Sequence, residues 1–383
     1  MAELPPSDLP ISDLPLEGIR VVTLEQAVAA PLCTRRLRLA GAEVIKIERP
    51  EGDFARGYDT AVNGESSYFV WANGGKKSVV LDLTQRKCVD QLRALIKESD
   101  VLVQNLKPGV MAKLGAALTD LHRENPRLIS VSIAGFHPDG PSAARKAYDL
   151  LMQAESGLAD ITGSAHEPGR VGVSIVDAST GSYAYEAILE ALIKRGITGR
   201  GEQIDIALFD AVADLLTVPY LLDRYGSGPP PRAGLAHPGI CPYGVFASSD
   251  GQKFILSIQN EREWQRLCET GLTRPELSSD SRCVDNETRV ANREFVDGEV
   301  EGVFSELVFD EIDARLEAAD LAYAPLHGLS HLKSHPDFHT FTTLVGDQEI
   351  HLLRIPGLHK PDALKLPKLG EHTAEVLAGL AGR

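Results

Sequence analysis

The first half of the chain alternates between two kinds of segment. Short runs rich in Val, Ile and Leu are typical of strands buried on both faces, and the longer segments between them repeat apolar residues at helical spacing. The runs predict strands over residues 16–24, 41–48, 78–83, 100–105, 128–133 and 203–208. A strand, a helix and a second strand within about 30 residues predict a parallel sheet. We therefore expect an α/β fold with a Rossmann-like, doubly wound parallel sheet.

The pattern changes after residue 225. Residues 226–234 are rich in Gly and Pro and predict a linker. Two apolar runs joined by Asp250-Gly251 then predict a hairpin over residues 243–258, and helical patterns follow over residues 261–271 and 286–320. We expect a tail over residues 1–15, a large Rossmann-like domain over residues 16–225, and a linker with a smaller α+β domain over residues 226–334.

One further segment, residues 172–181, predicts a short buried strand that ends in an acid and is followed by a helix. Val173, Ile175 and Val176 form the apolar run before Asp177. This places Asp177 at a helix N-terminus and at the carboxyl end of a strand, where open α/β sheets bind ligands. Two interpretations stay open: Asp177 caps the helix, or it is a nucleophile or base that faces a cleft.

Charge and composition exclude several classes of protein. The formal net charge of −15 disfavours nucleic acid and anionic membranes as partners. No apolar run reaches the roughly 18 residues that a membrane helix needs, and residues 1–15 lack the features of a signal peptide, so we expect a cytoplasmic protein. The five cysteines show no metal-ligand spacing, and Pro336 interrupts a series of histidines (His327, His331, His335, His339), so no metal site is expected.

Basic residues gather in or near the loops that follow predicted strands. They are Arg49, Arg56, Lys76, Lys77, Lys107 and Lys113. Side chains of this kind suit a ligand that carries phosphate groups. The chain has no GxGxxG, GxxxxGK[ST] or GxSxG motif, so a dinucleotide site, a triphosphate loop and a hydrolase nucleophile elbow are excluded. Tyr148 is a candidate to orient a carbonyl or carboxylate, or an aromatic anchor.

Several motifs together resemble the family III CoA-transferases, a group that includes formyl-CoA:oxalate and carnitine CoA-transferases. The resemblance runs from Leu16 to about Leu380. It rests on residues 16–21, residues 41–50, residues 105–109 (Asn-Leu-Lys-Pro-Gly), Tyr148-Asp149, Asp177 with Gly181, residues 198–201 and residues 369–373.

The resemblance implies that Asp177 is the nucleophile and that coenzyme A or acyl-CoA binds as a substrate, with no tightly bound cofactor. The positions that match the family's CoA contacts are Ala27, Val28, Arg49, Asn105, Leu106 and Lys113, with Lys146 and Tyr148 beside the thioester and Lys76 among the cations of the site. It also implies that residues 335–383 return to the large domain and that two subunits interlock as a homodimer.

Residues 25–31 and 54–59 most resemble family members that act on small dicarboxylates. Itaconate, mesaconate, citramalate or succinate, with succinyl-CoA as donor, fits this resemblance. We expect Arg56 to clamp the distal carboxylate, with Gln26 and His237 as further substrate contacts. His237 lies in residues 233–239, which match a mobile glycine-rich loop of the family with fewer glycines. Asp177 is expected to be ionised at neutral pH, to attack the acyl-CoA and to form an aspartyl-CoA thioester.

Two alternatives stay open. The same fold hosts α-methylacyl-CoA racemases, which place a histidine where this chain has Tyr148. Racemisation needs an acid/base group on each face of the α-carbon, and a tyrosine with a reference pKa of about 10 is a weak base, which favours transfer. The other alternative is a CoA-binding protein without turnover.

Overall fold

The computed structural model describes residues 14–226, 228–357 and 364–381, and the chain divides into two compact units. The first unit combines Met1–Ser156, Val171–Thr217 and His339–Arg383, and the second combines Gly157–Arg170 and Val218–Phe338. The predicted tail lies outside the described residues except for its last two positions. The sequence predicts residues 157–170 and 218–225 as parts of the large domain, whereas the structure places them in the second unit.

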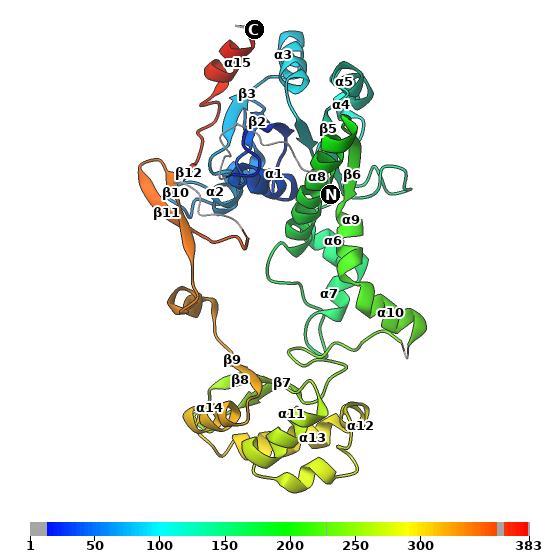
Figure 1. Cartoon of the computed structure of the whole chain (residues 1–383), viewed down its shortest axis with the longest axis vertical. Coiled ribbons are helices and arrows are strands. Elements are labelled where there is room, and N and C mark those ends of the chain that lie inside the picture. Colours follow the sequence, from blue (N-terminus) through cyan, green and yellow to red (C-terminus); the bar gives the residue numbers. More distant parts are fainter. Residues whose placement is uncertain (1–13, 227, 358–363, 382–383) are drawn as a thin grey trace, which may run out of the picture. The chain divides into compact units, whose positions relative to one another are not determined.

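A six-stranded parallel sheet forms the centre of the first unit, in the order β3-β2-β1-β4-β5-β6 (Figure 1). This confirms the α/β fold and its parallel sheet. The strands are β1 (Arg20–Leu24), β2 (Glu43–Glu48), β3 (Lys77–Val80), β4 (Val101–Gln104), β5 (Ile129–Ala134) and β6 (Gln203–Ala207). The strand order reverses between β1 and β4, and ligands of such sheets bind beside the carboxyl ends of the strands at that point.

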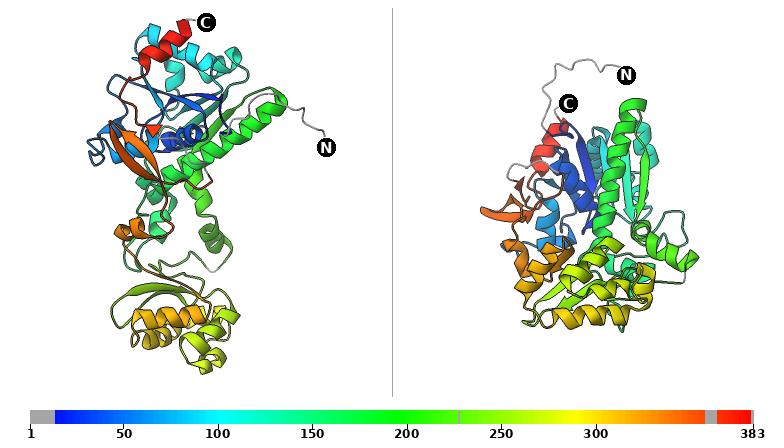
Figure 2. Two further views of the ribbon diagram at one scale, coloured as in Figure 1. Left: turned by 60° about the vertical axis from the view of Figure 1, so that its left-hand side comes forward. Right: turned by 60° about the horizontal axis from the view of Figure 1, so that its bottom comes forward.

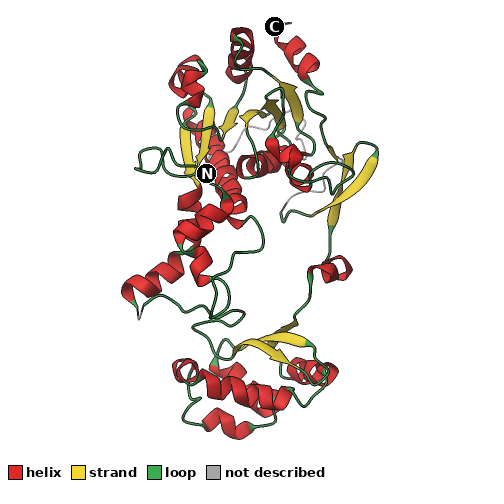
Figure 3. Ribbon diagram, turned by 180° about the vertical axis from the view of Figure 1, so that it is seen from behind, coloured by secondary structure: helices red, strands yellow, loops and turns green. Residues whose placement is uncertain are grey.

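Helices cover both faces of this sheet (Figure 3). On one face α1 and the long helix α8 pack against each other and against the strands (Figure 2), and on the other face α3, α5 and α15 enclose a core of Val, Ile and Leu. The helices of the first unit are α1 (Ala29–Leu39), α2 (Ser67–Asn73), α3 (Arg86–Lys97), α4 (Val110–Lys113), α5 (Leu118–Glu124), α6 (Asp149–Ser156), α8 (Ile175–Thr198), α9 (Leu208–Leu215) and α15 (Thr373–Ala381), with a 3₁₀ helix, η1 (Phe54–Gly57).

The predicted strand before Asp177 is wrong. Val173 is 62% exposed, and α8 already begins at Ile175. Ile175 and Val176 belong to the helix, in which Val176, Ala184 and Ile188 are buried on one face. A short apolar run fits a strand and a buried helix equally well, and here the packing of α8 on α1 decides between them.

A second, three-stranded sheet also belongs to the first unit. β10 (Thr340–Val345) pairs antiparallel with β11 (Gln348–Leu353) and parallel with β12 (Leu364–Lys365). Val345 and Leu366 pack there against Phe69 and Val70 of α2. The C-terminal part of the chain therefore packs on the N-terminal part.

The second unit has its own antiparallel sheet and its own core. The predicted hairpin is β7 (Tyr243–Ala247) with β8 (Lys253–Ser257), and β9 (Ala322–Pro325) pairs with β8. Phe254, Trp264 and Phe304 are among the buried core residues. The remaining elements are α7 (Leu158–Ile161), α10 (Thr217–Tyr225, which starts at the boundary), α11 (Glu261–Arg266), η2 (Leu267–Gly271), η3 (Pro275–Ser279), α12 (Asn286–Ala291), α13 (Arg293–Phe304), α14 (Phe309–Ala318) and η4 (Leu329–Ser334). Among the described residues of the whole chain, none of the helices is long and apolar enough to cross a membrane.

Gly181 allows α8 to approach α1 closely. A Cβ atom at this position would lie 2.7 Å from the carbonyl oxygen of Ala29 and 3.0 Å from Cβ of Leu32. We predict that Gly181→Ala lowers the free energy of unfolding by about 1–3 kcal/mol, because the two helices must separate. Urea denaturation measures this change.

Gly196→Ala in the same helix is the matched control. A Cβ at Gly196 meets nothing within 4 Å, so this variant keeps or gains up to about 1 kcal/mol from the better helix propensity of alanine. A Gly181→Ala variant as stable as the wild type would contradict the prediction.

Candidate functional site

A cavity of about 880 Å³ opens at the carboxyl ends of β1, β4 and β5. The loops that follow these strands supply most of its wall, and the start of α8 contributes Ser174 and Asp177. All of the lining residues belong to the first unit. The cavity holds these predicted site residues: Gln26, Ala27, Val28, Asn105, Leu106, Lys146, Tyr148 and Asp177.

Asp177 lies in the first turn of α8, as predicted, but it does not cap the helix. The carboxylate of Asp149 does so instead: its Oδ2 accepts hydrogen bonds from the backbone N–H groups of Val176 (2.8 Å) and Asp177 (3.1 Å). Asp149 begins α6 and is itself held by Gln153, which donates to Oδ1 at 2.6 Å. Asp149 thus fixes the end of α8 and leaves the Asp177 carboxylate facing the cavity.

This arrangement changes the acidity of Asp177. Burial, together with the negative charge of Asp149, raises the pKa of Asp177 to about 7. Helix N-terminal amides normally favour a carboxylate, but here the amides of the first turn bond to Asp149. The sequence predicts that Asp177 is ionised at neutral pH; with a pKa of about 7, its protonated and ionised forms coexist there.

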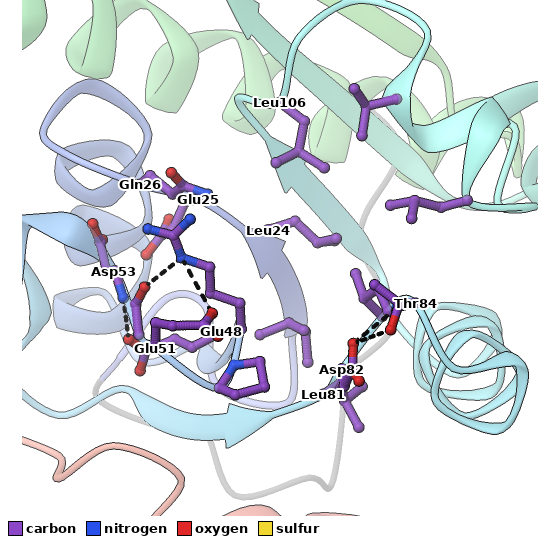
Figure 4. A pocket seen from close by; sticks show the side chains of 17 residues that line it. Leu24, Glu25, Gln26, Glu48, Glu51, Asp53, Leu81, Asp82, Thr84 and Leu106 are labelled. Atoms are coloured by element: carbon purple, nitrogen blue, oxygen red, sulfur yellow. Dashed lines mark hydrogen bonds and ion pairs between the residues drawn. The ribbon is translucent and has the colours of Figure 1, made fainter.

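A smaller cavity of about 400 Å³ shares Gln26, Leu106 and Val110 with the first one. Its wall combines leucines from the ends of β1 and β3 with the acidic loop after β2. Figure 4 shows Leu24 and Leu106 on one side of this cavity and Glu48 on the other. Arg49 lines it, with its side chain half exposed and Nε 3.0 Å from the carbonyl oxygen of Gly52. The leucines of this wall suit a mainly apolar group, and Arg49 adds a cation to the lining residues.

The structure corrects two predicted ligand residues. Lys76 is completely buried, and its ammonium group bonds to Glu25 (2.6 Å), Asn73 (3.1 Å) and the carbonyl oxygen of Pro31 (3.0 Å). Lys76 lines neither of the two cavities, and its ammonium group is held by these three partners. Arg56 forms a two-point ion pair with Glu48, at 2.8 and 2.9 Å, and its guanidinium lies 3.8 Å from the ring centre of Phe69. Arg56 lines neither cavity, so it is not free to clamp a substrate carboxylate.

Two other predicted residues are not among the residues that line these cavities. Lys113 is exposed at the end of α4 and lines neither cavity. His237 belongs to the second unit, where its ring stacks on Tyr243 at 5.4 Å and its carbonyl oxygen accepts a hydrogen bond from Arg293 at 2.7 Å. The roles given to these two residues stay predictions.

The larger cavity has an aromatic wall that was not predicted from the sequence, although two of its residues belong to the segment 54–59 that resembles dicarboxylate-specific relatives. Phe54, Tyr58 and Tyr68 line the larger cavity, and Tyr58 packs edge-on against Tyr68 at 5.5 Å. Burial, with the nearby carboxylates of Asp53 and Asp177, raises the pKa of Tyr58 to about 12, so its hydroxyl stays neutral. Asp149 was also missed as a capping residue. The pair Tyr148-Asp149 in front of an apolar helix was the available signal for it.

The α/β fold and the carboxylate in its cavity define a class of ligand-binding protein, and comparison with known proteins defines the family. The model of CoA-transferase family III matches residues 16–373. The chain therefore belongs to CoA-transferase family III, whose members act on CoA thioesters.

Individual relatives agree with this assignment. A succinate–glutarate CoA-transferase of Agrobacterium fabrum is 33% identical, with 98% of each chain covered. A succinyl-CoA:mesaconate CoA-transferase of Haloarcula hispanica is 31% identical, over 94% of this chain and 95% of that one. The crystal structure of a CAIB/BAIF family protein from Brucella suis has a TM-score of 0.81 and 34% identity, over 96% of this chain and all of that one (100%).

The raised pKa of Asp177 predicts a pH-dependent stability. The pKa of Asp177 is higher in the folded chain, at about 7, than in the unfolded chain. The folded chain therefore loses stability as the pH rises from the unfolded pKa toward the folded pKa. Asp177→Asn should therefore raise the free energy of unfolding by about 1–3 kcal/mol at about pH 8, and by less at about pH 5. Urea denaturation at both pH values measures this.

Asp210→Asn is the matched control, because Asp210 is an exposed carboxylate in the first turn of α9, outside both cavities. It should show no such gain. The assignment fails if Asp177→Asn is no more stable than the wild type at the higher pH.

Proposed function

We propose that this chain transfers CoA from a small acyl-CoA, such as succinyl-CoA, to a dicarboxylate, with Asp177 as the nucleophile. One observation carries the proposal: a carboxylate that forms no ion pair with a described residue faces an 880 Å³ cavity at the switch point of the sheet. A carboxylate held for structural reasons is normally paired or bonded to backbone amides. Here Asp149 takes that structural role.

Different parts of a CoA thioester would bind in the two cavities. The leucine-lined cavity beside Arg49 suits the adenine end, and the larger cavity suits the pantetheine arm and the acyl group. Lys107 and Lys146 also line the larger cavity, and neither forms an ion pair with a described residue. These cations are available to phosphate or carboxylate groups of the substrates.

The chemistry consists of acyl exchanges on Asp177. Its carboxylate attacks the thioester carbonyl, which forms a mixed anhydride and releases the CoA thiolate. The thiolate attacks the aspartyl carbonyl, which forms aspartyl-CoA and releases the donor acid. The acceptor carboxylate then repeats these steps in reverse and leaves as its CoA thioester. The thioester energy is kept throughout, and one difficult exchange becomes several easier ones.

The environment of Asp177 supports this role. A carboxylate that accepts hydrogen bonds from helix amides is a weaker nucleophile. Here the amides of Val176 and Asp177 donate to Asp149, so they do not bond to the carboxylate of Asp177. Partial burial strips water from the carboxylate, and this also underlies its raised pKa. Close to neutral pH a substantial fraction of the group is still ionised and able to attack.

The acceptor is proposed by class. The relatives named above use succinate, glutarate and mesaconate, which are all dicarboxylates. Mesaconate was among the acids expected from the sequence, with itaconate and citramalate, and glutarate now joins them. We further propose a cytoplasmic homodimer. Ile193 and Ile197, which are 68% and 84% exposed at the end of α8, support a partner subunit there.

Trapping the intermediate tests the nucleophile. After mixing with succinyl-CoA, the wild-type protein should gain a CoA adduct, and hydroxylamine should convert Asp177 to its hydroxamate. Intact and peptide mass spectrometry read out both changes. Asp177→Asn should lose the adduct and almost all activity, whereas Asp210→Asn should keep both. An active Asp177→Asn variant would contradict the nucleophile. Exchange of an α-proton with deuterated water in the absence of an acceptor would indicate a racemase instead.

Acceptor specificity tests the substrate class. With succinyl-CoA as donor, glutarate and mesaconate should give a kcat/KM at least about tenfold higher than acetate or butyrate. A charged hydrogen bond from Lys107 or Lys146 to the second carboxylate contributes about 1.5–3 kcal/mol, which corresponds to this ratio or more. Initial rates over a range of acid concentrations give the comparison. Equal kcat/KM values for dicarboxylates and monocarboxylates would contradict the proposed acceptor class.

A further inference from the structure

The turn between β1 and α1 has a strained backbone. Ala27 has a φ angle of +62°, in the left-handed region that residues with a Cβ rarely adopt. A non-glycine residue in this region is disfavoured by about 1–2 kcal/mol and needs support from its surroundings. The turn also matters for the site: Gln26 lines both cavities, and Ala27 and Val28 line the one that contains Asp177.

Two side chains hold this turn through its backbone. Asn105 bonds to both backbone groups of Gln26: its Oδ1 accepts from the N–H at 2.9 Å, and its Nδ2 donates to the carbonyl oxygen at 2.8 Å. Asp53 accepts from the N–H of Ala27, with its Oδ1 at 3.2 Å, and also from the N–H of Ala55 at 2.9 Å. Asp53 therefore connects the strained residue to the start of η1.

Asp53 is in turn fixed by a buried lysine. Lys46 lies in the middle of β2, is completely buried, and places Nζ 2.8 Å from Oδ2 of Asp53. The same ammonium group bonds to the Glu25 carbonyl oxygen at 3.3 Å. The backbone N–H of Asp53 donates to Glu48 at 3.1 Å. A buried ion pair of this kind is costly to desolvate and is weak support for overall stability, so its position against the turn needs another explanation.

We propose that Asp53, held by Lys46, is a positioning residue that keeps the Ala27 turn in its left-handed conformation and thereby shapes the wall against which the CoA thioester binds. This inference rests on the proposed function for its kinetic part. Asp53 acts through the backbone of Ala27, lines only the smaller cavity, and does not hold Asp177, which Asp149 fixes separately.

A double-mutant cycle tests the inference. Asp53→Ala should lower kcat/KM for succinyl-CoA about 10- to 100-fold, mainly through KM, because the wall of the binding cavity moves while the nucleophile stays in place. Glycine adopts the left-handed region without strain, so in an Ala27→Gly background the same change should cost less than about threefold. The inference is overturned if Asp53→Ala lowers kcat/KM by the same factor in the wild-type chain and in the Ala27→Gly chain. It is also overturned if the Asp53→Ala variant has wild-type kinetics.

Hydrogen–deuterium exchange gives a readout that does not depend on activity. Asp53→Ala should speed exchange in peptides that cover residues 24–32, while peptides from the middle of α8 stay unchanged. Arg195→Met is the control: it breaks another ion pair of this unit, between the buried Arg195 and the partly exposed Asp100 at 3.0 Å, and Arg195 is far from the turn in the sequence. It should lower stability without changing KM or exchange in residues 24–32.

The two readouts separate failure of the inference from failure of the function. If the wild type shows no CoA transfer but Asp53→Ala speeds exchange at the turn, the proposed function fails and the positioning role stands. If the wild type is active and exchange at the turn does not change in Asp53→Ala, the positioning role fails and the function stands. Should Asp53→Ala not fold, Asp53→Asn keeps the size and an acceptor oxygen, and the same changes are expected to a smaller degree.

Discussion

The site depends on two lysines buried beneath the carboxyl ends of the sheet. Lys46 and Lys76 have no access to water, so carboxylates within the protein must balance their charges. Glu25 forms ion pairs with both lysines. Burial alone would raise the pKa of Glu25, but the two ammonium groups lower it to about 2. Burial lowers the pKa of Lys76 to about 8, against the attraction of Glu25. The ion pairs of Lys46 and Lys76 with Glu25 and Asp53 thus fix the loops that follow β1 and β2.

Asp177, which lines the cavity at the carboxyl ends of the strands, has the opposite electrostatic environment. Burial and the negative charge of another carboxylate, that of Asp149, raise the pKa of Asp177 rather than lower it. Glu25 and Asp53, which shape the site, are thus paired with buried lysines. Asp177, which faces the cavity, forms no ion pair with a described residue. A group in this state destabilises the folded chain while it is ionised, which is the usual relation between reactivity and stability at functional sites.

Much of the site was predictable because its residues follow strand ends. Gln26, Asn105 and Leu106 come directly after β1 and β4, and parallel strands bring such positions to one edge of the sheet. Lys46 also carried a readable signal: a lysine in the middle of a strand that is buried on both faces must be buried and paired. The aromatic wall of Phe54, Tyr58 and Tyr68 had no comparable signal, since these residues lie in a 3₁₀ turn, a loop and a short helix.

The sequence alone determined the six strands of the central sheet, their parallel arrangement and the placement of Asp177 in the first turn of a helix, because residue periodicity and strand–helix alternation are local properties. The family resemblance supplied the carboxylate's expected role. Only the tertiary structure decided which charges pair. Glu25 and Lys76 are 51 positions apart, and Asp149 and Val176 are 27 apart. Contacts of this kind pair Lys76 and Arg56 with carboxylates of the protein and make Asp149, not Asp177, the cap of α8. They also raise the pKa of Asp177, because the electrostatic environment of a group depends on its neighbours in space.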